Sequence, residues 1–261
     1  MVLLNFKVGD VVTRKSHNND IVFKILNISN GIVYLKGVDL RLYADSYIED
    51  LEYSKIDSDD DLIIDRNIKD LDINRDNYFY MPGKILHIDG DNEYLDRCMN
   101  YYKKIGIKAN GITIKEEHIR NKILGLLNEY KPDILVITGH DAFYNKSNDK
   151  NDLNNYQNSK NFIKAIKEAR KYERNQDKLI IVAGACQSNY EELIKSGANF
   201  ASSPKRINIH ALDPAIIASS IAFSLKNQSI DIIKLIEKTK YGSDGIGGII
   251  TNGTMYVGYP R

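Results

Sequence analysis

Residues 179–188 read Leu179-Ile-Ile-Val-Ala-Gly-Ala-Cys186-Gln-Ser188. The five consecutive apolar residues from Leu179 to Ala183 predict a buried parallel strand, because helices cover both faces of such a strand. The strand ends in Gly184-Ala-Cys186, and a helix is expected from Ser188. The thiol of Cys186 would then lie at the carboxyl end of a strand, near a helix N-terminus whose dipole favours the thiolate.

The strand expected before it in the chain has the same form. Asp133-Ile-Leu-Val-Ile-Thr-Gly-His140 is an apolar run, a glycine and then a titratable residue. Because neighbouring parallel strands end at the same edge of a sheet, we expect Cys186 and His140 on one rim. A cysteine nucleophile and its general base require this pairing.

Strand-like and helix-like segments alternate from Gly83 onward, which predicts a doubly wound α/β domain with a mainly parallel sheet. The expected strands cover residues 84–89, 107–114, 133–138, 179–183 and 199–202. The expected helices cover residues 92–104, 115–130, 162–172, 188–195 and 230–238, with one more opening at Asp213-Pro214. The glycines between residues 242 and 258 indicate a hairpin or loop near the sheet edge.

Two different regions precede this domain. Residues 1–52 contain short alternating segments at 8–13, 20–26 and 31–36, separated by Asn-rich turns, and predict a small antiparallel barrel of the SH3-like kind. Residues 53–82 include the acidic run Asp57-Ser-Asp-Asp-Asp61 and lack periodicity, which indicates a linker. The expected organisation is therefore 1–52, 53–82 and 83–261.

Composition excludes several function classes. The 261 residues are 43% hydrophobic and 27% charged, ordinary globular values, and the net charge of +1 gives no argument for nucleic acid or an anionic membrane surface. No apolar run is long enough for a membrane span, and the start of the chain does not read as a secretory signal. Only two cysteines are present, so a reducing cytoplasm is expected and a zinc cluster is not. We expect no metal and no cofactor.

Each candidate residue has an alternative interpretation. Cys98 falls mid-helix, between Leu95 and Met99, as a buried structural thiol would. His210 is the rival base for Cys186. Amidotransferase-like hydrolases place the cysteine before the histidine, whereas caspase-like peptidases place the histidine about 50 residues before the cysteine. Here 46 residues separate His140 from Cys186.

Three carboxylates, Asp89, Asp91 and Asp141, are expected at the same strand ends. Together they would suit a basic substrate side chain, arginine best, because its planar guanidinium can bind a carboxylate bidentately. Alternatively, Asp89 and Asp91 cap the helix that follows. Asp244, in the glycine-rich tail, is the next candidate for an acid in the specificity pocket.

The order apolar strand, histidine, apolar strand, Ala185-Cys186 resembles the caspase, clostripain and gingipain clan of cysteine peptidases. That clan usually has His-Gly where this chain has His140-Asp141, and its arginine-specific members often carry Asp at the position of Gly184. A resemblance to the YabG family of sporulation-specific peptidases covers nearly the whole chain. The motifs that carry it are Lys7–Ser16, Leu86–Asp91, Asp133–Ala142, Ala183–Ser188 and Ala198–Pro214.

The resemblance implies a caspase-like fold and a cysteine endopeptidase that processes spore coat and coat-assembly proteins in the mother-cell cytoplasm. It also implies that backbone N–H groups of Cys186 and around Gly139, Asp141 and Gly184 bind the oxyanion. Protein substrates are then the expected partners, without nucleic acid or membrane. The alternatives are an amidotransferase-like hydrolase that uses His210, and an inactive module that tethers a coat assembly.

Overall fold

The computed structural model describes residues 6–55, 60–69, 78–144 and 149–259. The chain divides into two compact units, residues 1–62 and 63–261, and each is described by itself. Residues 56–59 and 70–77 of the expected linker lie outside the described residues.

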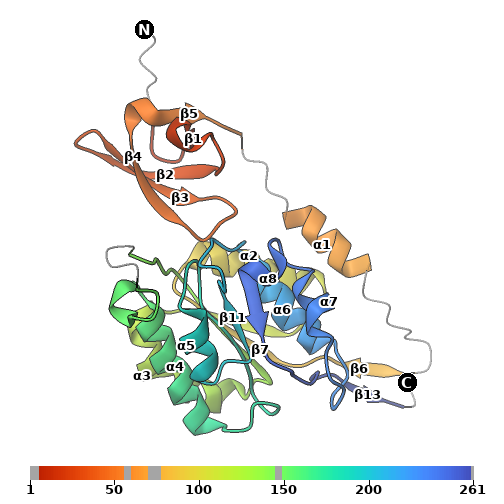
Figure 1. The fold of residues 1–261 in the computed structure, drawn as a ribbon. Coiled ribbons are helices and arrows are strands. Elements are labelled where there is room, and N and C mark those ends of the chain that lie inside the picture. Colours follow the sequence, from red (N-terminus) through yellow and green to blue (C-terminus); the bar gives the residue numbers. More distant parts are fainter. Residues whose placement is uncertain (1–5, 56–59, 70–77, 145–148, 260–261) are drawn as a thin grey trace. The chain divides into compact units, whose positions relative to one another are not determined.

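The first unit is a five-stranded antiparallel sheet in the order β4-β3-β2-β1-β5 (Figure 1). Its strands are β1 (Val11–Arg14), β2 (Phe23–Ser29), β3 (Ile32–Gly37), β4 (Tyr43–Tyr47) and β5 (Leu51–Tyr53), with short 3₁₀ turns at Lys15–His17 and Ile48–Asp50. Alternate residues of β2 and β3 enter a small core that includes Phe23, Val33 and Leu35. The sheet confirms the antiparallel strands expected here, and the SH3-like assignment stays a prediction.

The second unit is built on a six-stranded sheet in the order β12-β11-β10-β9-β7-β8. Its strands are β7 (Ile85–Asp89), β8 (Ala109–Thr113), β9 (Ile134–Thr138), β10 (Ile180–Ala183), β11 (Phe200–Ser202) and β12 (Ile246–Gly248). All neighbours are parallel except β12, which runs antiparallel to β11. The strand order reverses between β7 and β9, the point at which open α/β sheets bind their ligands.

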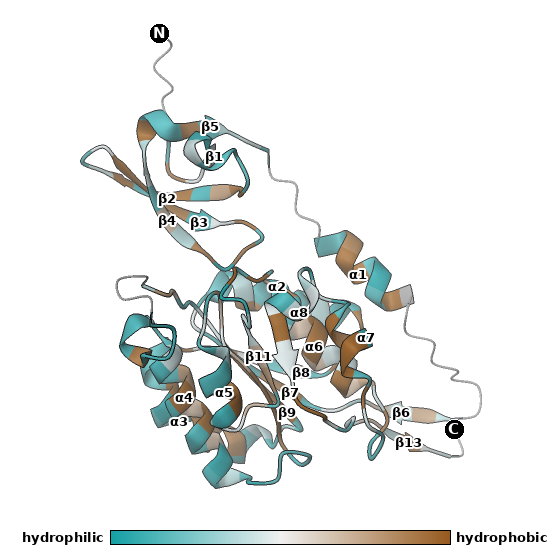
Figure 2. Ribbon diagram, in the orientation of Figure 1, coloured by the Kyte–Doolittle hydropathy of each residue, from teal (hydrophilic) through white to brown (hydrophobic). Residues whose placement is uncertain are grey.

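Helices cover both faces of this sheet, as the apolar runs predict (Figures 1 and 2). One face packs on α2 (Asn92–Lys104), α6 (Asp213–Ala222) and α7 (Ile232–Ile236), and the other on α3 (Glu116–Tyr130), α4 (Ser159–Tyr172) and α5 (Tyr190–Lys195). Successive strand residues alternate between the two cores: Ile180 and Val182 face one, Ile181 and Ala183 the other. The doubly wound α/β prediction is confirmed, whereas the caspase-like assignment remains a prediction.

Several elements differ from the expectation. The expected linker contains α1 (Asp60–Lys69) and β6 (Phe79–Met81). The glycine-rich tail forms no hairpin of its own: α8 (Gly242–Gly245) leads into β12, and β13 (Tyr256–Gly258) pairs with β6. A 3₁₀ turn, Leu153–Asn155, follows the loop after β9. Within the described residues, no helix is both long and apolar enough to cross a membrane.

Candidate active site

Cys186 and His140 follow two neighbouring strands at the same level. Where β10 pairs with β9, the last partners are Ala183 and Ile137, and each candidate lies three residues beyond its strand's member of that pair. Hydrogen bonds join the residues that follow them: Ser188 Oγ donates to Asp141 Oδ2 at 2.9 Å, and Phe143 N donates to Gln187 Oε1 at 3.1 Å. The two strand-end loops are therefore tied together beside the thiol and the imidazole.

The sulfur of Cys186 is fully buried and lies against a third loop. The backbone N–H of Ile209 donates to Sγ at 3.3 Å, and the carbonyl oxygen of Ile209 lies 3.9 Å from the same atom. A hydrogen bond donated to sulfur favours its ionised form. The loop between β11 and α6 therefore contacts the sulfur directly.

His140 is buried among carboxylates. Its Nδ1 lies 3.7 Å from Glu116 Oε1, and its Nε2 lies 3.7 Å from Asp91 Oδ2. Its backbone N–H donates to Glu116 Oε1 at 2.8 Å, and its carbonyl accepts a hydrogen bond from Asn158 Nδ2 at 2.9 Å. The Tyr94 ring stands 5.8 Å away, centroid to centroid. Residues of α2 and α3 therefore surround the imidazole, and the loop before α4 holds the backbone of His140.

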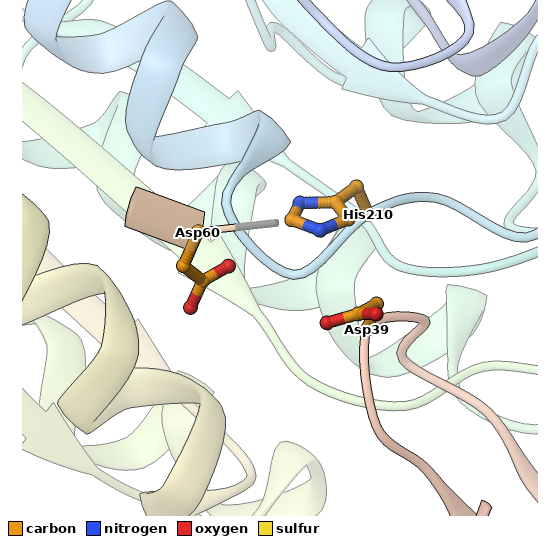
Figure 3. A group of neighbouring side chains, drawn as sticks. All are labelled: Asp39, Asp60 and His210. Carbon is orange, nitrogen blue, oxygen red and sulfur yellow. The ribbon is translucent and has the colours of Figure 1, made fainter. Parts of the chain in front are cut away.

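The rival base His210 lies next to Ile209, in the loop that leads into α6 (Figure 3). Its Nδ1 accepts a hydrogen bond from Leu212 N at 3.2 Å. Because that nitrogen must present a lone pair to an N–H, neutral His210 carries its proton on Nε2. In that form Nδ1 could take up a proton only if this hydrogen bond were broken. Asp39 and Asp60, which the same figure labels, belong to the first unit.

The three aspartates of the predicted pocket have partners inside the protein. Asp89 is fully buried: its Oδ2 accepts from Thr138 Oγ1 at 2.7 Å and its Oδ1 from Asp91 N at 2.9 Å. Asp91 Oδ1 caps α2, accepting from Glu93 N at 2.9 Å and Tyr94 N at 3.2 Å. The capping alternative therefore describes Asp91, whereas Asp89 braces the turn that leads to that cap.

Asp141 is 5% exposed and holds the loops around the site. Its Oδ1 accepts from the N–H groups of Ala142 and Asn158, and its Oδ2 from the hydroxyls of Ser159 and Ser188. Burial raises the pKa of the Asp141 carboxyl, and the hydrogen bonds from Ser159, Asn158 and Ser188 offset this only in part. All four carboxylate oxygens of Asp89 and Asp141 accept hydrogen bonds from within the protein, and the expected role of these residues in a substrate pocket stays a prediction.

The backbone N–H groups expected near the oxyanion differ in whether they already have a hydrogen-bond acceptor. Gly184 N donates to Ile137 O at 3.0 Å and so extends the sheet, and its expected place beside the oxyanion stays a prediction. Gly184 has a φ of +106°, and an added Cβ would lie 2.8 Å from Leu193, so glycine is required there for shape. In the part of the chain that the structure describes, the N–H groups of Gly139 and Asp141 have no recorded acceptor.

Sequence reasoning missed Glu116. It stands in the first turn of α3, where acidic residues are common because they favour the helix dipole, and it looks like its exposed neighbour Glu117. In the structure its side chain is only 6% exposed, against 58% for Glu117. The only signal in the sequence was the pair of glycines, Gly90 and Gly139, that make room for it.

A buried thiol and a carboxylate-flanked histidine lie on one rim of a doubly wound sheet, which gives the class of the protein as a doubly wound α/β protein. Comparison with known proteins identifies its family. The family described as YabG peptidase U57 matches residues 7–69 and 60–260. The sporulation-specific protease YabG of Bacillus subtilis (strain 168) is 41% identical over 286 residues, covering 98% of this chain and 99% of that protein. The chain therefore belongs to the YabG peptidase family and is a sporulation protease.

Proposed function

We propose that the chain is a cysteine endopeptidase in which Cys186 is the nucleophile and His140 the general acid and base. The observation that carries the proposal is the joined pair of loops: Ser188 to Asp141 and Gln187 to Phe143 tie the residues after the thiol to those after the imidazole. The hydrogen bond from Ile209 N to the sulfur supports a thiolate. The alternatives, an amidotransferase-like hydrolase and an inactive module, do not fit a member of a peptidase family.

The mechanism follows from these positions. The Cys186 thiolate attacks the scissile carbonyl carbon, and protonated His140 donates its proton to the leaving amine, which leaves a thioester. His140 then takes a proton from water, the resulting hydroxide attacks the thioester, and the thiolate returns. Backbone N–H groups of Cys186, Gly139 and Asp141 are the proposed oxyanion donors, and one such donor is worth on the order of 100-fold in rate.

Substitution tests the nucleophile and the base. Cys186→Ala and His140→Ala should each abolish peptide cleavage while the circular dichroism spectrum remains folded. Cys98→Ala is the matched control, because Cys98 is equally buried, lies within α2 and donates to the carbonyl of Ala211 at 3.4 Å, away from the strand ends. It should keep its activity. Turnover by a verified Cys186→Ala protein would end the proposed mechanism.

We further propose cleavage after basic residues, arginine above all, with Asp244 as the acid of the specificity pocket. Asp244 is exposed in α8, and its neighbour Gly245 accepts a hydrogen bond from Ser203 N at 2.7 Å. Ser203 Oγ in turn accepts from Gln187 N at 3.0 Å, one residue from Cys186. This chain of contacts supports a carboxylate near the mouth of the site.

Peptide-library profiling tests the specificity. Asp244→Asn should lower kcat/KM for arginine peptides by about tenfold or more, while Glu237→Gln, another exposed acid, should leave it unchanged. A preference for acidic or aliphatic residues at the cleaved position would refute the proposal. The substrates we propose are spore coat and coat-assembly proteins in the mother-cell cytoplasm. New N-termini in coat extracts treated with the wild type, but absent with Cys186→Ala, would identify them.

A further inference from the structure

Glu116 is a buried acid whose oxygen is directed entirely at His140. Its Oε1 accepts the His140 N–H at 2.8 Å and lies 3.7 Å from Nδ1 of the same residue. One carboxylate oxygen therefore holds both the backbone and the ring of the histidine. A first-turn acid that only favours the helix dipole would face solvent, as Glu117 does.

Two glycines from different strand ends make the space for this carboxylate. A Cβ added at Gly90, after β7, would lie 2.1 Å from Glu116 Oε1, and one added at Gly139, after β9, would lie 2.2 Å from it. Lys115, the residue before Glu116, donates through Nζ to the carbonyl of Gly90 at 3.0 Å. The ends of β7 and β9 and the start of α3 thus fit together around one oxygen atom.

We propose that Glu116 is a positioning residue that orients His140 and stabilises the imidazolium formed when His140 holds the thiol proton of Cys186. This inference rests on the proposed function, since it assigns a role through His140. A buried carboxylate is stable only when it is paired, and Glu116 Oε1 meets both the backbone N–H and the ring of His140. Glu116 would then raise the fraction of Cys186 present as thiolate before substrate binds.

Two other groups face His140. Asp91 Oδ2 lies 3.7 Å from Nε2, while Oδ1 of the same residue caps α2. The Tyr94 ring packs against the imidazole with an interplanar angle of 48°. Burial by itself would raise the pKa of Glu116, but the hydrogen bonds and charge of His140 hold that pKa below its ordinary value. Glu116 is therefore a carboxylate at neutral pH, as the role requires.

Alkylation of Cys186 by iodoacetamide, followed against pH without substrate, measures this role directly. Glu116→Gln keeps the side-chain size and an oxygen for the His140 N–H, but removes the charge. We expect its alkylation profile to move to higher pH by about one pH unit and kcat/KM to fall on the order of 10- to 100-fold, mainly in kcat. Glu117→Gln is the matched control and should superimpose on the wild type.

A second pair of variants tests the same role from the backbone side. Gly90→Ala should push Glu116 aside and reproduce the shift, whereas Gly125→Ala, in the middle of α3 with open space around its Cα, should not. If Glu116→Gln does not fold, Glu116→Asp and Gly90→Ala test the same role. The alkylation profile of Glu116→Asp, which keeps the charge, should shift less than the profile of Gly90→Ala.

The outcomes separate this inference from the proposed function. Unshifted profiles for Glu116→Gln and Gly90→Ala, with Cys186→Ala inactive, would overturn the role of Glu116 alone. An equal shift in Glu117→Gln would also overturn it, because the effect would then be a general effect of charge. Turnover by Cys186→Ala would overturn the proposed function itself.

Discussion

At the scale of single residues, carboxylates dominate the site, and each has a different task. Asp89 accepts hydrogen bonds from the turn after β7, Asp91 caps α2, and Asp141 ties the loops after β9 and β10. Glu116 alone directs its oxygen to both the backbone and the ring of His140. The sequence places three acids at the rim correctly, but their partners decide whether they bind substrate or stabilise the rim.

The lowered pKa of Glu116 predicts a pH dependence of stability. A carboxyl whose pKa is lower in the folded state stabilises the fold above its unfolded pKa, and this contribution is lost as the pH falls through the folded value. The wild type should therefore lose more Tm than Glu116→Gln as the pH falls from about 5 to about 3. Differential scanning calorimetry measures this difference. Glu117→Gln should follow the wild type, and parallel curves for all three proteins would contradict the prediction.

At the residue level, the position of a side chain along a strand could be predicted from the sequence. Cys186 and His140 follow apolar runs, and the paired strands bring them to one level. Prediction failed where chemistry depends on side-chain direction. Nothing in the local sequence distinguishes buried Glu116 from exposed Glu117, because the space between Gly90 and Gly139 exists only after three elements have packed.

At the scale of elements, the site depends on loops held in strained conformations. Gln187, Ser203 and Arg206 all have positive φ angles, of +57°, +64° and +57°, which non-glycine residues seldom adopt. Gln187 N donates to Ile207 O and to Ser203 Oγ, and its side chain accepts from Phe143 N. Three strand-end loops are thus joined through the residue after Cys186, and these bonds maintain the strain.

Replacing Gln187 with glycine distinguishes the effect of its positive φ from the effect of its side-chain hydrogen bonds. Gln187→Gly accepts a positive φ without cost but loses the side-chain bonds, so we expect little change in stability and a fall in kcat/KM of about tenfold. Asn227→Gly is the control, because Asn227 also has a positive φ, of +65°, and is exposed. It should keep full activity. Thermal denaturation and peptide hydrolysis measure both quantities, and equal activity of the two variants would contradict the role of these loop contacts.

The start of α6 offers a second test at this scale. Asp213 is fully buried, and its carboxylate accepts from His210 N at 3.0 Å and Lys240 N at 3.0 Å. Asp213→Ala should lower the free energy of unfolding by about 2–4 kcal/mol, because a buried and a partly buried N–H group lose their acceptor. Asp231→Ala, which removes an exposed cap from α7, should cost about 1 kcal/mol. Urea denaturation measures both, and equal losses would contradict the assigned role.

Strands could be predicted where the local sequence pattern determines them, but not where packing does. Strands β9 and β10 are read directly from their sequence, because a strand buried on both faces must be apolar throughout. Strand β12 has no such pattern, since it is Ile246-Gly-Gly248. A Cβ at Gly247 would lie 2.7 Å from the Tyr190 hydroxyl, and one at Gly248 would lie 2.4 Å from the Phe200 ring. This strand can pack here because two of its three residues are glycines, and a hydrophobicity pattern cannot indicate that.

At the scale of the whole molecule, two units with separate cores share one chain, and the family match extends over both. Cys186, His140 and Glu116 all belong to the second unit. The acidic composition of residues 53–82 predicted a linker, yet α1 lies in that segment. Its Ile64 is 2% exposed and belongs to the same core cluster as Tyr101 and Leu235. One apolar face of α1 is therefore part of the catalytic unit rather than a connection.

Two truncations test this assignment. A fragment of residues 60–261 retains Ile64 and should fold, react with iodoacetamide at Cys186 and hydrolyse short peptides at a rate near that of the full chain. A fragment of residues 78–261 lacks α1 and exposes the core that Ile64 covers, so it should be less stable by about 2–5 kcal/mol, the range for a large buried aliphatic side chain. Ile64→Ala in the longer fragment should reproduce most of that loss, whereas Leu62→Ala, at a side chain that is 70% exposed, should not. Urea denaturation and the alkylation rate measure stability and site integrity separately. A folded 60–261 fragment whose Cys186 does not react would contradict the assignment, because the site would then need the first unit.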